Sequence, residues 1–197
     1  MKRLTATTVL CLLLFSAAFV TGKGPSAAPE YPDSLRSVWL YTEGIKQNAI
    51  ARDTVRAREF FAEAIRNDST FAPAYYEMAA NGMYSTPDEA VNLARTAFRL
   101  DTANKWYHQF LGQALIYARR YDEALAVYDQ HCWGVVKAYS QDQIGAVSLL
   151  ARLELEGVDV GPRWQQLAPY LLQRQHDHVL PFLDMQYLYG LARAGRP

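Results

Sequence analysis

The chain has 197 residues, half of them hydrophobic, and its 20 basic side chains balance 20 acidic ones. This balance leaves no basic stripe along the chain, which argues against nucleic acid and anionic membrane surfaces as partners. The two cysteines are Cys11 and Cys132. If the N-terminal segment is removed, only Cys132 remains, and we interpret it as a small buried hydrophobe rather than a nucleophile. An intermolecular disulfide through it is the alternative in an oxidising compartment.

Residues 1–22 have the pattern of a secretory signal peptide. A basic pair is followed by the uncharged apolar segment 4–20, and small residues surround the expected cleavage point after Ala18 or Gly22. Residues 23–33 then read as an extended linker. The alternative is a single retained anchor, although a bilayer span needs roughly 20 apolar residues. We therefore expect an exported protein, periplasmic or extracellular, and not a multi-pass membrane protein.

Apolar residues spaced three, four and seven apart predict paired helices after the linker. Asp53 is expected to cap one of them, and Thr86-Pro87-Asp88-Glu89 is a complete helix start with a capping threonine and a glutamate three residues later. The expected helices are Ser34 to about Ile50, Asp53 to Asn67, one from Phe71, one from Thr86, Trp106 to Ala118 and Tyr121 to His131. Further helices are expected after Ser140 and after Gly161-Pro162.

Small residues recur in these helices with a fixed period. Ala57, Ala90 and Ala124 are 33 and 34 residues apart, and Ala79 and Gly112 are 33 apart. Such a period with two helices per unit indicates a stacked helical repeat. Small residues are needed where paired helices approach closely, while bulky neighbours fill the gaps.

This arrangement resembles the tetratricopeptide repeat (TPR) family, and residues 37–131 carry the resemblance. The resemblance implies an all-α fold, a right-handed superhelical solenoid of helix-turn-helix repeats. We expect residues 34–197 to form one TPR-like domain, with irregular helices over 132–197. The region from Gln186 to the end looks like the first helix of another repeat without its partner. Its open apolar side predicts either a piece of a longer array or self-association.

A second resemblance lies in the C-terminal part. It is carried by Ala126-Val-Tyr-Asp-Gln-His131, the segments 148–157 and 160–164, and Phe182-Leu-Asp184. These segments resemble the tetratricopeptide repeat protein 38 family. The resemblance implies a fold more than a function. The chain departs from that family at three positions, where Trp, Asp and His are replaced by Ala151, Gly145 and Gln186.

In the repeat type that the chain resembles, the first helix of each pair lines a concave groove that binds partners. Aromatic side chains there suit peptide contacts, because they bury a large area at modest entropic cost. We therefore predict a non-catalytic scaffold or adaptor that binds a protein or peptide and needs no cofactor. The expected groove residues are Tyr41, Tyr76, Met83, Tyr84, Trp106, Gln109, Gln113 and Tyr117.

Sequence motifs for catalysis or metal binding are weak in this chain. The chain has no glycine-flanked nucleophile and no phosphate-binding loop, so we expect no enzyme. The sequence His176-Asp177-His178 is the best metal candidate, and we interpret it as a solvated polar loop. A further set of polar residues is expected to form a buried network, or alternatively a small-ligand or enzymatic pocket around His131 and Arg152. Its members are Asp129, His131, Arg152 and Asp184.

Overall fold

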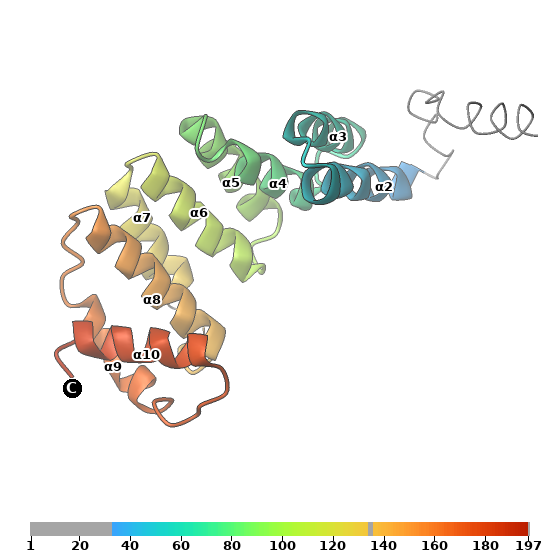
Figure 1. Cartoon of the computed structure of the whole chain (residues 1–197). Helices are drawn as coiled ribbons and strands as arrows, with labels where there is room; N and C mark the ends of the chain where they lie inside the picture. Colours follow the sequence, from blue (N-terminus) through green and yellow to red (C-terminus); the bar gives the residue numbers. More distant parts are fainter. Residues whose placement is uncertain (1–32, 134–135, 197) are drawn as a thin grey trace, which may run out of the picture. The chain divides into compact units, whose positions relative to one another are not determined.

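The computed structural model describes residues 33–133 and 136–196, and this part of the chain is helical without any strand (Figure 1). The expected signal peptide and nearly all of the expected linker lie outside the described residues. The chain divides after Arg36, and the packing described below is that of the larger unit, Ser37–Pro197. None of the described helices is both long enough and apolar enough to span a bilayer.

The first three helix pairs follow the order that the sequence predicts. Asp53 accepts a hydrogen bond from the Arg56 backbone N–H at 2.9 Å and so caps its helix as expected. The helices are α2 (Asp33–Lys46), α3 (Thr54–Asn67), α4 (Ala72–Gly82), α5 (Pro87–Leu100), α6 (Lys105–Tyr117) and α7 (Tyr121–Val127). Neighbouring helices from α3 to α7 pack against one another.

The alanines that mark the repeat lie where the helices meet. Each has no exposed surface, so the helix backbones approach as closely as a methyl group permits. These residues are Ala57, Ala64, Ala79, Ala90, Ala97 and Ala124. In the first pair Gly44 is smaller still, since an added Cβ would lie 2.4 Å from Cε1 of the buried Phe61 ring. The expectation that small residues set the helix spacing is confirmed.

Two helices end in π-helical turns that the sequence did not predict. The turn η1 (Gln47–Ala51) extends α2, and η2 (Tyr128–Cys132) extends α7. The turn η1 lies between Gly44 and Ala57, which are 13 residues apart, whereas Gly112 and Ala124 of the third repeat are 12 apart. A π turn widens the helix by one residue and so accommodates an insertion without disturbing the helix that follows.

Helix α5 begins at Pro87 as expected, but the contacts at its start differ from those of a capping box. Thr86 occupies the cap position without a side-chain hydrogen bond to a cap N–H. Its hydroxyl lies 3.0 Å from Glu89 Oε2 instead. Glu89 also accepts a hydrogen bond from Arg58 of α3 at 3.0 Å. The Thr86 backbone N–H, which Glu89 would accept from in a capping box, donates to the Gly82 carbonyl at 2.8 Å instead.

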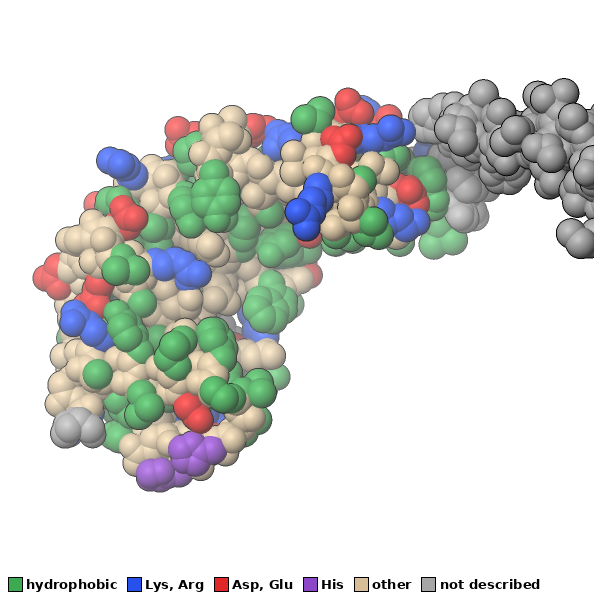
Figure 2. All heavy atoms as spheres, viewed as in Figure 1, with side chains coloured by type: hydrophobic (Ala, Val, Ile, Leu, Met, Phe, Trp, Pro, Cys, Tyr) green, Lys and Arg blue, Asp and Glu red, His purple; other side chains and the backbone are tan. Residues whose placement is uncertain are grey.

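The C-terminal helices α8 (Ser140–Leu155), α9 (Arg163–Leu172) and α10 (Pro181–Arg193) form the irregular section. Helix α8 packs on α6, and α10 packs on both α8 and α9. Gly190 lets α10 approach Leu171 and Val147 closely, so one side of the last helix packs on the helices before it. The outer side of α10 is nevertheless apolar and exposed, as Figure 2 shows, at Phe182, Met185, Leu188 and Tyr189.

We expect Gly44→Ala to destabilise the protein by about 1–3 kcal/mol, because the new methyl group overlaps a ring that has no free space to move into. Urea unfolding measures the change. The matched control is Thr42→Ala on the same helix, which is exposed and should shift the unfolding free energy by less than about 0.5 kcal/mol. Equal effects of the two substitutions would show that the approach of α2 to α3 is not constrained at this point.

Candidate binding surface

Helix α6 presents a row of polar and aromatic side chains between α4 and α8. Trp106, Gln109, Gln113 and Tyr117 follow one another at intervals of three and four residues, so they share one face of the helix. The row spans about 16 Å, given the rise of 1.5 Å per residue. We call these four residues, together with Tyr84 and Arg152, the α6 surface.

At its C-terminal end the α6 surface carries a pair of exposed tyrosines. The ring centroids of Tyr84 and Tyr117 lie 4.9 Å apart in an edge-to-face arrangement, and the two residues are 74% and 40% exposed. Hydrogen bonding to Tyr84 is the main cause that raises the pKa of Tyr117, while Arg152 and a hydrogen bond with Gln113 act in the opposite direction. The Tyr117 hydroxyl is therefore the point where side chains of α6, α8 and the end of the second pair's first helix converge.

At its N-terminal end the α6 surface opens into a pocket of about 680 Å³. Trp106, which is 57% exposed, and Tyr139, which is 49% exposed, stand at the pocket. Gln109 reaches toward α8 at Gly145, where an added Cβ would lie 3.1 Å from the amide oxygen. The lining consists of Thr102, Ala103, Asn104, Lys105, Trp106, His108, Gln109, His131, Cys132, Val136, Tyr139, Gln141, Asp142 and Gly145.

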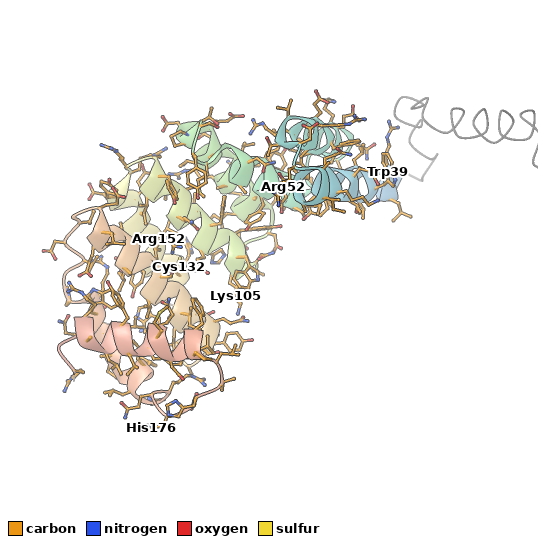
Figure 3. The ribbon with its side chains drawn as sticks, viewed as in Figure 1. Trp39, Arg52, Lys105, Cys132, Arg152 and His176 are labelled. Atoms are coloured by element: carbon orange, nitrogen blue, oxygen red, sulfur yellow. The ribbon has the colours of Figure 1, made fainter. Side chains whose placement is uncertain are left out.

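The charges of this pocket neutralise one another. Lys105, labelled in Figure 3, has its Nζ 3.9 Å from the centre of the Tyr139 ring and 3.6 Å from Asp142 Oδ1. Burial raises the pKa of the Cys132 thiol to about 12, so the thiol is protonated at neutral pH. Tyr139 and Asp142 were not predicted from the sequence because they lie outside the regular repeats, and Lys105 was missed because the helix was expected to begin one residue later, at Trp106.

Three of the predicted groove residues contribute to packing rather than to open surface. Met83 is only 7% exposed and belongs to the core. Tyr76 packs against Tyr107 and Phe110, with ring centroids 5.5 and 4.7 Å away. Tyr41 packs in the same way against two phenylalanine rings, Phe61 and Phe71. Tyr84, Trp106, Gln109, Gln113 and Tyr117 are the predicted groove residues that keep accessible surface outside such packing.

The four residues of the predicted polar cluster are not joined by hydrogen bonds or ion pairs to one another, and three of them have other polar partners. Asp129 pairs with Arg163 of α9 at 2.6 Å, and Asp184 lies 3.2 Å from His178 Nδ1. Arg152 donates to Ser148 one turn earlier in α8. His131 lines the pocket beside α6, whereas Arg152 does not. In the described part of the chain no three His, Cys, Asp or Glu side chains are placed to hold a metal ion together.

No family model matches the chain. The resemblance to the tetratricopeptide repeat protein 38 family therefore rests on the quoted residues alone. Among solved structures the chain is similar to that reported as "Crystal structure of MamA", with a TM-score of 0.52, 16% sequence identity, and coverage of 83% of this chain and 82% of that one. MamA is a TPR-like helical repeat protein. The likeness confirms the expected fold class, an all-α TPR-like solenoid.

His131 lies on η2 next to His108 and Phe98, with ring centroids 5.4 and 4.9 Å away. Burial, and secondly the neighbouring His108, lower the pKa of His131. The unfolded chain therefore binds a proton below pH 6.5 more readily than the folded protein does, and stability falls as the pH drops through this range.

We expect His131→Gln to lose less unfolding free energy than the parent between pH 7.5 and pH 5.5. Urea unfolding at the two pH values measures the difference. His176→Gln, in an exposed loop, should retain the parent's pH dependence. If His131→Gln and the parent lose the same amount, the environment of His131 does not disfavour its charged form.

Proposed function

We propose that this protein is a non-catalytic scaffold or adaptor that binds a protein or peptide partner along the α6 surface. The observation that carries the proposal is the row of exposed aromatic and part-buried amide side chains from Trp106 to the Tyr84–Tyr117 pair. Tyrosine and tryptophan are enriched among the residues that dominate binding energy at interfaces. Their exposure on adjoining rigid helices pre-organises such an interface.

The chemistry at this surface supports binding rather than catalysis. The Cys132 thiol in the adjoining pocket is protonated, since its pKa is about 12. The Gln109 and Gln113 amides supply hydrogen-bond donors and acceptors without titrating. TPR-like solenoids offer extended binding surfaces of this kind. The MamA-like fold supports the scaffold role in general terms.

The proposed setting is an exported assembly of a cell envelope, in the periplasm or outside the cell. Its support is the pattern of residues 1–22, with a basic pair, an apolar segment and small residues in the order of a signal peptide. Self-association through the exposed side of α10 stays a prediction. That side carries Phe182, Met185 and Leu188.

A second candidate function is small-ligand binding in the pocket beside α6. Its volume of about 680 Å³ falls within the range of ligand sites, roughly 300–1,000 Å³. His131 lines this pocket, as the ligand hypothesis requires, but Arg152 does not. The two functions differ in their dependence on the Tyr84–Tyr117 pair, which is absent from the pocket lining.

We expect the double variant Tyr84→Ala/Tyr117→Ala to lose at least tenfold in partner recovery while it stays folded. The rings are exposed and contribute little to the core, whereas truncation of an interface tyrosine commonly costs 2 kcal/mol or more, on the order of thirtyfold in affinity. Pull-down from envelope extract, followed by titration of the purified partner, measures the loss. Circular dichroism checks the fold.

The control is Ile50→Ala/Val55→Ala, which removes two exposed apolar side chains of η1 and α3, elements that contribute nothing to the α6 surface. Undiminished partner binding by the tyrosine variant would refute this assignment of the interface. Loss of binding in both double variants would indicate non-specific hydrophobic capture.

A further inference from the structure

We propose that the partner segment is acidic at one end and bulky and apolar at the other, with a carboxylate on Arg152 and an apolar side chain, four or five residues away, in the pocket beside Trp106. This inference rests on the proposed function, since it names the chemistry of the partner that the α6 surface binds. Arg152 at one end of the surface supports the acidic residue, and the pocket at the other end supports the apolar residue.

Arg152 differs from the other arginines of the described part of the chain. Each of the other partly buried ones forms an ion pair with a carboxylate, whereas Arg152 has none among the described residues. The paired residues are Arg58 with Glu89, Arg95 and Arg120 with Glu123, Arg163 with Asp129, and Arg174 with Asp177. A partly buried guanidinium without a counter-ion has lost hydration that no protein carboxylate replaces.

The geometry of Arg152 leaves its charge available to a ligand. Both of its hydrogen bonds, to the Ser148 carbonyl and hydroxyl, use Nη1 alone. The Nη2 and Nε groups can then donate side by side to a carboxylate, the bidentate geometry that makes arginine–carboxylate contacts strong. Arg152 lowers the pKa of Tyr117, so an anion bound to Arg152 would lie beside the exposed Tyr84–Tyr117 pair.

The pocket at the other end suits an uncharged apolar group. Lys105 is already engaged by Asp142 and the Tyr139 ring, so the lining has no net charge to offer. Trp106 and Tyr139 are exposed aromatic walls. Aromatic rings in edge-to-face or offset contact attract one another beyond the burial of their surfaces, which favours an aromatic side chain of the partner in this pocket.

The distance between the two ends sets the spacing of the motif. The row from Trp106 to Tyr117 covers about 16 Å. An extended peptide advances about 3.3 Å per residue, so the acidic and apolar residues would be four or five positions apart. Gln109 and Gln113 lie between them, and Gln109 forms no hydrogen bond with any described residue. Its amide is free to pair with the backbone of the segment.

The test is selection from a random dodecapeptide display library on the full chain, with Arg152→Gln and Tyr84→Ala/Tyr117→Ala selected in parallel. Arg99→Gln is the matched control, because it removes an exposed guanidinium on α5 that donates to the Thr96 hydroxyl. We expect the parent and Arg99→Gln to enrich peptides with Asp or Glu four or five positions from an aromatic residue. Arg152→Gln should keep the aromatic preference and lose the acidic one.

A selected peptide and its Glu→Gln or Asp→Asn analogue then test the contact directly. Fluorescence anisotropy should show that Arg152→Gln lowers the affinity for the acidic peptide at least tenfold. The affinity for the neutral analogue should stay within about twofold of the parent's, as a double-mutant cycle requires for direct coupling. Circular dichroism confirms that each variant folds.

The outcomes separate the two proposals. Peptides that depend on Tyr84 and Tyr117 without acidic enrichment, or acidic enrichment that survives in Arg152→Gln, would overturn the inference and leave the proposed function standing. If the parent selects no peptides beyond those selected by the tyrosine variant, both proposals fail.

Discussion

The close approach of helices at small side chains is the constraint on which the rest of this structure depends. Helix pairs bury their apolar sides only where alanine or glycine lets two backbones meet, as Gly44 does against Phe61 and Gly190 against Leu171. A bulkier residue at such a point would separate the pair and expose the apolar side chains around it. Small residues therefore recur with the repeat period because helices must touch at the same position in each repeat.

The same packing determines which side chains are left for binding. Residues that face a neighbouring helix, such as Tyr76 and Met83, are taken up by contacts within the protein. Those at the free side of α6 keep their surface because α4 and α8 flank the helix without covering it. Helix α8 completes the site, since it contributes Arg152 at one end and Asp142 at the other.

The candidate site was only partly predictable for a reason that particular residues illustrate. Tyr84 and Met83 are adjacent in the chain, and sequence spacing assigned both to the groove, but Met83 is buried and Tyr84 is largely exposed. Helical periodicity has an error of about one position at a helix end, where the angle between side chains changes. The sequence could not tell which of the polar residues Asp129 and Arg152 forms an ion pair, because their partners depend on how α8 and α9 pack.

The sequence by itself determined the class of fold, the helix pairs and the small residues at which the helices meet. These follow from the periodicity of apolar residues within each helix and from a spacing that recurs in successive repeats. Only the tertiary structure decided that α10 packs on α8 and α9, that the pocket forms between α6 and α8, and that Arg152 pairs with Ser148 and with no carboxylate of the described residues. These features arise from contacts between segments far apart in the chain, outside the repeat. The spacing of residues along one helix does not determine which helix from outside the repeat packs against it.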